Sequence, residues 1–206
     1  MPKIITVYSL KGGSGKTTIT LLLAQYLKNK GKSVTLIDSD ISQKSTVNWI
    51  ENSNFDIDCY LIENSLSKDD LKDIKTDYII IDGVPKADKY VEQILTLSDT
   101  VIIPVQPSQL SLSSFLQDNH LNLLKKISVK DVNLIAVINK TTQFTKKEEI
   151  SLRKIIKEYS PINEIYSLGL RKAFVIDYSK RFFDSKNSTA KNELGYLGDK
   201  ILSKHN

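Results

Sequence analysis

The sequence has 206 residues, of which 40% are hydrophobic and 26% charged, with a net charge of +5. This length suits one domain with a core large enough to need no disulfide or structural metal, so we expect residues 1–206 to form a single domain. The single cysteine, Cys59, excludes an intramolecular disulfide and a cysteine-based metal cluster, and no run of 18 apolar residues spans a membrane, which makes the cytoplasm the expected location.

The first predicted strand, Ile4–Ser9, leads directly into a glycine-rich loop, and a helix is predicted to follow at Lys16–Lys30. Glycines let the backbone curl so that successive N–H groups point at phosphate oxygens, and the helix N-terminus adds partial positive charge. The pattern G-x-x-x-x-G-K-[ST] has its first glycine where this chain has Leu10. The sequence nevertheless predicts a phosphate site formed by Lys11, Gly12, Gly13, Ser14, Gly15, Lys16, Thr17 and Thr18.

Three side chains or amides of this loop have distinct expected roles. Lys16 would reach the β- and γ-phosphates of ATP, the Thr17 hydroxyl would coordinate Mg²⁺, and the Thr18 N–H would meet the α-phosphate. A purely structural glycine-rich hairpin is the alternative. It does not explain two lysines and two threonines in these positions after a buried strand.

The next predicted strands are Val34–Asp38, Asp58–Ile62 and Tyr78–Asp82, and two of them end in an aspartate. In open α/β sheets, ligands bind at the carboxyl ends of the strands. Asp82 follows four apolar residues, which is the Walker B pattern, and it would hold Mg²⁺ directly or through water. An aspartate at a strand end also serves to cap the following helix, and this alternative stays open for Asp38.

The remaining predicted elements continue the alternation of strands and helices. Strands are predicted at Thr100–Val105 and Asn133–Asn139, helices at Leu110–Ile127 and Lys146–Tyr159, and the last forty residues are also predicted to be helical. The packing stripe of that last segment is Leu194, Leu197, Ile201 and Leu202. Most strands are nearly continuous Val, Ile and Leu, which is typical of burial on both faces of a parallel sheet. The sequence therefore predicts an α/β fold with a doubly wound, mostly parallel sheet flanked by helices.

The run Lys11–Thr18 resembles the deviant Walker A motif of the ParA/MinD group of P-loop NTPases. Residues 36–43, 78–85 and 101–108 resemble that group less specifically, and residues 169–202 loosely resemble the tail of its small, plasmid-type (ParF-like) members. The resemblance implies an ATPase that uses ATP and Mg²⁺ and forms an ATP-dependent homodimer. In that group the extra lysine, here Lys11, reaches across the dimer to the ATP of the other subunit, so a cation completes charge neutralisation only when the dimer forms.

The same resemblance implies roles for three residues at strand ends. Asp40 would orient the attacking water, Asp38 would support Mg²⁺ and the switch region, and Asn139 would hydrogen-bond the adenine, although it fits equally well as a turn residue. The group's Asp-x-Asp-Pro-Gln segment reads Asp38-Ser39-Asp40-Ile41-Ser42-Gln43 here, which affects the expected switch geometry and hydrolysis rate. The expected catalytic residues are Lys11, Lys16 and Asp40, and the expected metal ligands are Thr17, Asp38 and Asp82.

Basic residues are concentrated in the second half of the chain. Residues 1–103 carry 12 Lys and Arg against 14 Asp and Glu, whereas residues 104–206 carry 17 against 10. A basic half is compatible with a polyanion such as DNA, although lysines often form only a solvated face. Together with the resemblance, this predicts nonspecific DNA binding through Lys146, Lys147, Arg153, Lys154, Arg171, Lys172, Lys180 and Arg181. The expected function is plasmid or chromosome partition by slow ATP hydrolysis, with a ParB-like centromere-binding partner that stimulates it and association with the nucleoid in the ATP-bound state.

Three other functions belong to the same resemblance. A MinD-like membrane ATPase needs a C-terminal amphipathic helix in the lipid interface. The tail at residues 195–204 contains two glycines and indicates core packing, so no stable membrane insertion is expected. A nitrogenase-type iron protein or metal-cluster carrier needs cysteine ligands at a dimer axis, which the lone Cys59 does not supply. A positioning ATPase whose cargo is not DNA is also compatible with the sequence.

Overall fold

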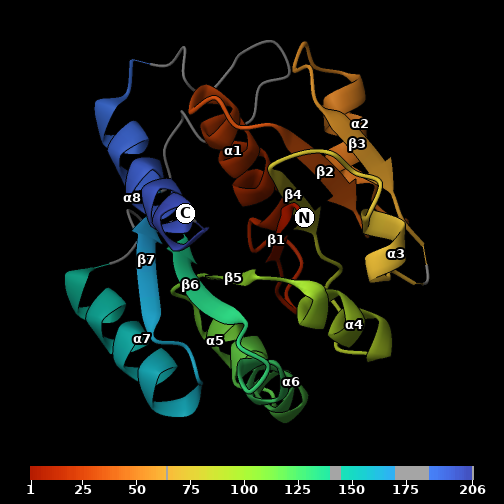
Figure 1. Cartoon of the computed structure of the whole chain (residues 1–206). Helices are drawn as coiled ribbons and strands as arrows, with labels where there is room; N and C mark the ends of the chain where they lie inside the picture. Colours follow the sequence, from red (N-terminus) through yellow and green to blue (C-terminus); the bar gives the residue numbers. More distant parts are fainter. Residues whose placement is uncertain (64, 140–144, 170–185, 206) are drawn as a thin grey trace.

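The computed structural model describes residues 1–63, 65–139, 145–169 and 186–205. Within these residues a seven-stranded sheet has the order β3-β2-β4-β1-β5-β6-β7 (Figure 1), and every neighbouring pair is parallel. The strands are β1 (Lys3–Val7), β2 (Val34–Asp38), β3 (Asp58–Leu61), β4 (Tyr78–Asp82), β5 (Thr100–Val105), β6 (Asn133–Asn139) and β7 (Glu164–Leu168). The predicted α/β fold with a parallel sheet is therefore confirmed.

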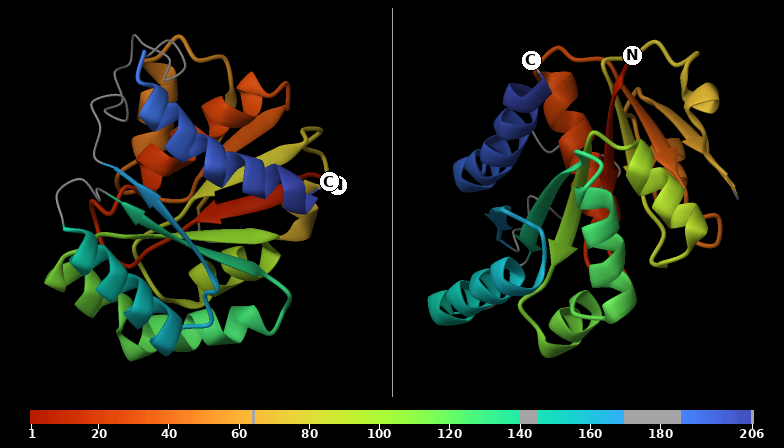
Figure 2. Two further views of the ribbon diagram at one scale, coloured as in Figure 1. Left: turned by 90° about the vertical axis from the view of Figure 1, so that its left-hand side faces the viewer. Right: turned by 60° about the horizontal axis from the view of Figure 1, so that its bottom comes forward.

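Helices cover both faces of this sheet (Figure 2). They are α1 (Lys16–Asn29), α2 (Ser45–Glu51), α3 (Lys68–Leu71), α4 (Lys89–Leu97), α5 (Gln109–Phe115), α6 (Asp118–Ser128), α7 (Lys146–Tyr159) and α8 (Ser188–His205). Buried side chains of α1, α2 and α8 belong to one core cluster, whereas those of α3 to α7 belong to two clusters on the opposite face. None of the helices in the described part of the chain is long and apolar enough to cross a membrane.

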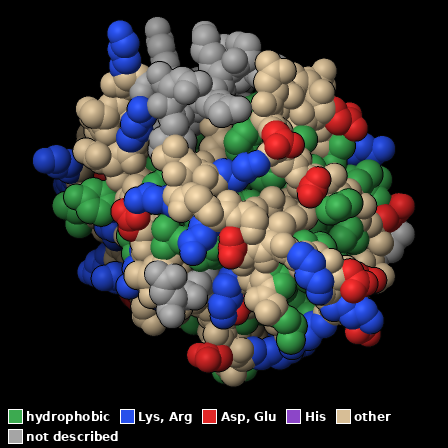
Figure 3. All heavy atoms as spheres, turned by 45° about the horizontal axis from the view of Figure 1, so that its top comes forward, with side chains coloured by type: hydrophobic (Ala, Val, Ile, Leu, Met, Phe, Trp, Pro, Cys, Tyr) green, Lys and Arg blue, Asp and Glu red, His purple; other side chains and the backbone are tan. Residues whose placement is uncertain are grey.

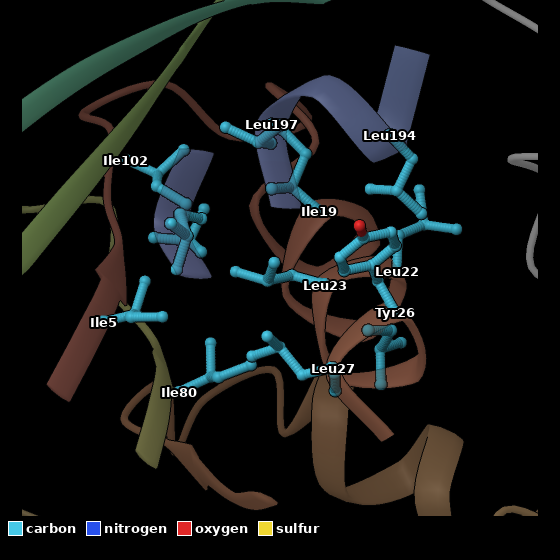
Figure 4. Close-up of a cluster of buried hydrophobic side chains, with 14 of the residues drawn as sticks. Ile5, Ile19, Leu22, Leu23, Tyr26, Leu27, Ile80, Ile102, Leu194 and Leu197 are labelled. Carbon is cyan, nitrogen blue, oxygen red and sulfur yellow. The ribbon is translucent and has the colours of Figure 1, made fainter. Parts of the chain in front are cut away.

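The alternation of side chains along the central strands separates the two cores. Ile80 of β4 packs in the cluster of α1 and α8, whereas its neighbours Ile79 and Ile81 pack in a cluster on the other face. Leu194 and Leu197 of α8 lie over α1 in Figure 4, and both are fully buried. Helix α1 is enclosed between the sheet and α8, so the helix that follows the glycine-rich loop has a fixed position.

The structure departs from the sequence-based elements mainly at three places, and β3 also ends at Leu61 rather than Ile62. The predicted helix Leu110–Ile127 is divided into α5 and α6, because the backbone of Gln117 is extended between them. The strand β7 was not predicted, because Glu164–Leu168 is a half-exposed edge strand that lacks a continuous apolar run. The strand β1 ends at Val7 rather than Ser9, although the Tyr8 N–H still donates to the Ile102 carbonyl of β5 at 2.8 Å.

Candidate nucleotide and magnesium site

The glycine-rich loop joins the central strand β1 to α1 at the carboxyl edge of the sheet. Gly13 and Gly15 have φ values of 70° and 103°, a left-handed region that glycine adopts without steric cost. Gly15 is the N-cap of α1, which has no side-chain cap and no acidic residue in its first turn. The first N–H groups of a helix lack intrahelical acceptors, so this end of α1 is suited to bind an anion.

Side chains from neighbouring elements hold the outer side of this loop. The Gln106 amide donates to the Gly13 carbonyl at 2.7 Å, and the Asn139 amide donates to the Ser14 carbonyl at 3.0 Å. The buried Ser9 and Ser14 hydroxyls lie 2.6 Å apart. In a trans peptide the N–H points opposite to the C=O, so the amides that follow Gly13 and Ser14 face away from the donating side chains.

Asn139 lies behind the loop in this structure. It is the last residue of β6, is only 9% exposed, and contacts the loop through the bond to the Ser14 carbonyl. A Cβ built on Gly15 would lie 2.3 Å from the Asn139 side-chain nitrogen, so the two residues are in close contact. In this structure Asn139 braces the phosphate loop, where the sequence left an adenine ligand and a strand-end turn residue as equal alternatives.

Two of the predicted carboxylates meet at adjacent strand ends. Asp38 and Asp82 are register partners at the ends of β2 and β4, and Asp82 is also the partner of Val7 in β1. The Thr17 hydroxyl donates to Asp82 Oδ2 at 2.6 Å, and the Thr46 hydroxyl donates to the same oxygen at 2.7 Å. Asp82 Oδ1 is buried and has no hydrogen-bond partner among the residues that the structure describes.

Burial governs the ionisation of Asp82. It raises the pKa of this carboxyl to about 6, while the hydrogen bonds from Thr17 and Thr46 oppose the shift. Burial also lowers the pKa of the Lys16 ammonium, against the opposing effect of Asp82 and Asp40. A buried carboxylate beside a partly desolvated lysine is the electrostatic arrangement that a phosphate-bound cation complements.

The carboxylates of Asp38 and Asp40 both accept hydrogen bonds from the segment that follows β2. Asp38 is fully buried and accepts three backbone N–H groups, those of Asp40 at 3.0 Å, Thr46 at 2.9 Å and Val47 at 3.3 Å. Asp38 therefore caps the start of α2, which is the helix-capping role that the sequence had left open for it. The Asp40 carboxylate accepts from the Ser42 hydroxyl at 2.6 Å within the same loop.

The side chain of Lys11 extends from the glycine-rich loop to the start of α5. Its ammonium approaches the Ser108 hydroxyl at 3.5 Å, a distance at which a hydrogen bond is weak. Ser108 is the N-cap of α5 and accepts the Ser111 N–H at 3.2 Å. Within the described ranges Lys11 has no ion pair.

The residues present fit a magnesium ion bound together with phosphates. Mg²⁺ is usually held by one or two protein oxygens, several waters and phosphate oxygens, and it does not need a cage of side chains. Thr17 and the unpartnered Oδ1 of Asp82 supply such oxygens next to the phosphate loop. In the described residues no cluster of three or more His, Cys, Asp or Glu offers a metal site of another kind.

Four of the eight proposed DNA-binding residues lie in the described part of the chain, all on α7. Lys146, Lys147 and Lys154 are exposed on α7, whereas Arg153 is half-buried, pairs with Glu149 at 3.0 Å and donates to the Ile165 carbonyl at 2.9 Å. On the face shown in Figure 3, basic side chains are interspersed with acidic ones. The other four residues lie outside the described part of the chain, and they are Arg171, Lys172, Lys180 and Arg181.

Three contacts at this site were not anticipated from the sequence. Thr46 and Gln106 reach the site from α2 and the end of β5, and Ser39 donates its hydroxyl to the Asp82 carbonyl at 2.7 Å. Gln106 belongs to residues 101–108, which resemble the ParA/MinD group, and that resemblance could have pointed to it as a site residue. Thr46 offered no comparable signal, because its partner is 36 residues away in the sequence.

The parallel sheet, the glycine loop between β1 and α1 and the paired carboxylate define a nucleotide-binding protein of the P-loop class. Residues 5–181 match the CobQ/CobB/MinD/ParA nucleotide-binding domain. The chain therefore belongs to this family, which confirms the resemblance seen in the sequence.

Two curated relatives match part of the chain. Protein ParA of Rhizobium radiobacter is 28% identical over 112 residues, which are 52% of this chain and 50% of that protein. The maintenance of carboxysome distribution protein A of Halothiobacillus neapolitanus is 30% identical over 115 residues, which are 52% of each. The chain thus spans about half the length of these curated relatives.

Solved structures match over the full length. A plasmid partition protein from Borrelia burgdorferi has a TM-score of 0.65 at 23% identity, covering 97% of this chain and 99% of that one. MinD of Pyrococcus horikoshii complexed with Mg-ADP has a TM-score of 0.70 at 14% identity, covering 100% and 99%. The complex of Cyanothece McdA with ATP has a TM-score of 0.71 at 17% identity, covering 97% and 96%. At these identities the likeness establishes the shared fold.

Proposed function

We propose that this protein is a ParA-type ATPase that partitions DNA and hydrolyses ATP slowly with Mg²⁺. The observation that carries the proposal is the Asp82 carboxylate, which is bonded to Thr17 of the phosphate loop and keeps a buried oxygen available for a cation. The family membership and the likeness to a plasmid partition protein support the same conclusion.

In this proposal the chain's own residues bind and orient the nucleotide. The loop amides and Lys16 bind the phosphates, while Thr17 and Asp82 hold Mg²⁺, which supplies neutralisation of the developing phosphate charge when it is bound. Asp40 lies on the exposed loop before α2 and would orient water, and Asp38 keeps that loop in place through its backbone contacts. No strong base is evident among these groups, which favours slow turnover.

The test of the ATPase is direct. Purified protein should bind ADP and ATP, and it should release phosphate slowly from ATP in the presence of Mg²⁺. Lys16→Met removes the cation at the phosphates without adding volume and should abolish detectable nucleotide binding. Failure of the wild-type protein to bind either nucleotide, or a sub-second turnover time without any partner, would refute the proposal.

The DNA-binding step is tested by retention of DNA with ATP, ADP or no nucleotide at two salt concentrations. Nonspecific DNA binding is electrostatic, so retention with ATP should fall steeply between low and high salt. A combined Lys146→Ala, Lys147→Ala and Lys154→Ala variant should weaken retention, whereas Arg153→Ala should act mainly on stability because Arg153 is paired internally. Retention that is absent or independent of ATP would argue against DNA as the cargo.

Lys11 is proposed to act in the ATP-dependent homodimer. Its ammonium has only the weak Ser108 contact in the described part of its own chain, which suits a lysine that finds its anionic partner across an interface. Lys11→Ala should weaken dimerisation and hydrolysis at least about tenfold while nucleotide binding is largely kept. Light scattering and phosphate release measure the two effects, and a variant that dimerises and turns over normally would contradict the assignment.

A positioning ATPase with a cargo other than DNA is the second candidate. It is favoured by the likeness to MinD and McdA structures, which is as close as that to the plasmid partition protein. Sedimentation with liposomes, with and without ATP, separates the membrane form of this alternative from DNA partition. The stimulating partner, which we propose to be a ParB-like centromere-binding protein, is tested by its effect on phosphate release.

A further inference from the structure

The side chain of Thr46 connects helix α2 to the carboxylate of the candidate magnesium site. Thr46 is fully buried, and it is the second residue of α2. Its hydroxyl donates to Asp82 Oδ2 at 2.7 Å, while its backbone N–H donates to Asp38 Oδ2 at 2.9 Å. The start of α2 is thus held by two carboxylates at the ends of β2 and β4.

The two hydroxyl contacts on Asp82 determine which oxygen is left for a ligand. Thr17 of α1 and Thr46 of α2 both donate to Oδ2, and each bond to an ionised carboxylate is stronger than a neutral one. The carboxylate is therefore fixed by donors from two helices, with Oδ1 remaining unpartnered among the described residues. Among the residues that the structure describes, loss of the Thr46 hydroxyl would leave Thr17 as the only side-chain donor to the Asp82 carboxylate.

Helix α2 contains the only tryptophan of the chain, one turn beyond Thr46. Trp49 is 6% exposed and packs against Phe55 at a ring-centroid distance of 6.0 Å. The helix is short and begins after Lys44, which has a φ of 48° that is uncommon for a residue with a side chain. A change in the Thr46 contact would therefore displace a short helix that carries the buried Trp49 side chain.

We propose that Thr46 is a positioning residue that orients Asp82 for Mg²⁺ and couples the nucleotide site to helix α2. This inference rests on the proposed nucleotide function of the same site. When Mg²⁺ and a nucleotide bind, the Asp82 carboxylate becomes held in one orientation. The hydrogen bond from Thr46 extends that restriction to helix α2. The fluorescence emission of Trp49 should change as a result, because Trp49 lies on the same helix.

The matched variants are Thr46→Val, which keeps the shape and removes the hydroxyl, and Thr46→Ser, which keeps the hydroxyl. Binding of ADP is titrated with and without Mg²⁺, and Trp49 emission is recorded in the same samples. We expect Thr46→Val to bind ADP without Mg²⁺ as the wild type does, within about twofold, but to need about tenfold more Mg²⁺ for half-maximal effect, as expected from loss of one charge-assisted bond. Its Trp49 response to Mg²⁺ should be largely lost, and Thr46→Ser should restore both readouts.

The outcomes separate this inference from the function on which it rests. Wild-type protein that binds no ADP would refute the nucleotide site itself. Wild-type protein that binds ADP, with a Thr46→Val variant that keeps the wild-type Mg²⁺ dependence and Trp49 response, would overturn the role of Thr46 alone. If Thr46→Val does not fold, hydrogen exchange of the α2 amides in wild-type protein decides. Exchange should slow when Mg²⁺ is added to the ADP complex, and unchanged exchange would overturn the proposal.

Discussion

At the scale of single residues, three glycines differ in what a side chain would meet. Gly12 has ordinary φ and open space around it, Gly31 has a φ of 77° with open space, and Gly15 combines a φ of 103° with a Cβ position 2.3 Å from the Asn139 amide. Gly12 therefore has neither backbone strain nor crowding, Gly31 has strain alone, and Gly15 has both, so comparing the three separates the two effects.

We expect alanine substitution at these glycines to reduce the free energy of unfolding in a graded way. Gly12→Ala should change it by less than about 0.5 kcal/mol, Gly31→Ala should lower it by about 1 kcal/mol, and Gly15→Ala should lower it by about 2 kcal/mol or more. Urea unfolding of the three variants without nucleotide measures the effect. A Gly15→Ala protein that loses no more stability than Gly31→Ala would mean that the contact with Asn139 does not constrain the loop.

The residues of the site were predictable to the extent that they are contiguous in the sequence. The loop Lys11–Thr18 and the terminal Asp82 of a buried strand are local patterns, and the structure brings Thr17 and Asp82 into contact. The brace from Asn139 and the contact from Thr46 depend on how distant elements meet, so no local pattern specified them. Asp38 shows the limit most clearly, because the same position fits either a metal ligand or the helix cap that its backbone contacts form.

At the scale of elements, burial decides which strands the sequence reveals. β2, β4, β5 and β6 have the predicted bounds, since they are apolar throughout and covered on both faces. The edge strand β7 is half-exposed and alternates in polarity, so it was missed. The break between α5 and α6 was also missed, because the apolar periodicity of the two helices continues across Gln117 without a proline or glycine to mark it.

Helix α8 contains two glycines whose surroundings differ sharply. A Cβ on Gly198 would lie 2.2 Å from the ring of Tyr26 in α1, whereas a Cβ on Gly195 would meet no atom within 4 Å. Gly195→Ala should stabilise the protein by about 0.5–1 kcal/mol through helix propensity, and Gly198→Ala should destabilise it by about 1–3 kcal/mol through overpacking. Thermal melting of both variants tests this, and equal melting temperatures would show that α8 does not pack closely on α1.

His120 makes the junction of α5 and α6 sensitive to pH. Its ring lies between Tyr8 and Phe115, with centroid distances of 5.6 and 5.3 Å, and its Nδ1 donates to the Phe115 carbonyl at 2.7 Å. Burial lowers the pKa of His120 below its ordinary value of 6.5, so the folded state holds the neutral ring. The unfolded chain takes up the proton first, and stability therefore falls as the pH drops below about 6.5.

We expect His120→Gln to flatten this part of the stability profile. The wild type should lose more stability than the variant between pH 7.5 and pH 5.5, as measured by urea unfolding at each pH. His205 remains in both proteins, so the difference isolates His120. Equal losses in the two proteins would show that His120 is not protonated on unfolding in this range.

At the scale of the whole molecule, one sheet connects all the described strands. β3 with the neighbouring Trp49 lies toward one edge, and β7 forms the other edge, while α1 and α8 share a core across the middle. We propose that residues 1–206 unfold as a single domain. Trp49 emission and far-ultraviolet circular dichroism should then give the same midpoint in urea, and two separated transitions would refute it.

The order of the strands has a consequence for synthesis of the chain. β1 pairs only with β4 and β5, with Lys3 opposite Tyr78 and Ile5 opposite Thr100. β1 therefore has no strand partner until β4 has been synthesised and only one until β5 follows, and long-range pairings of this kind form slowly. The glycine loop directly after β1 is translated early, yet its final shape depends on Gln106 and Asn139, which are made much later.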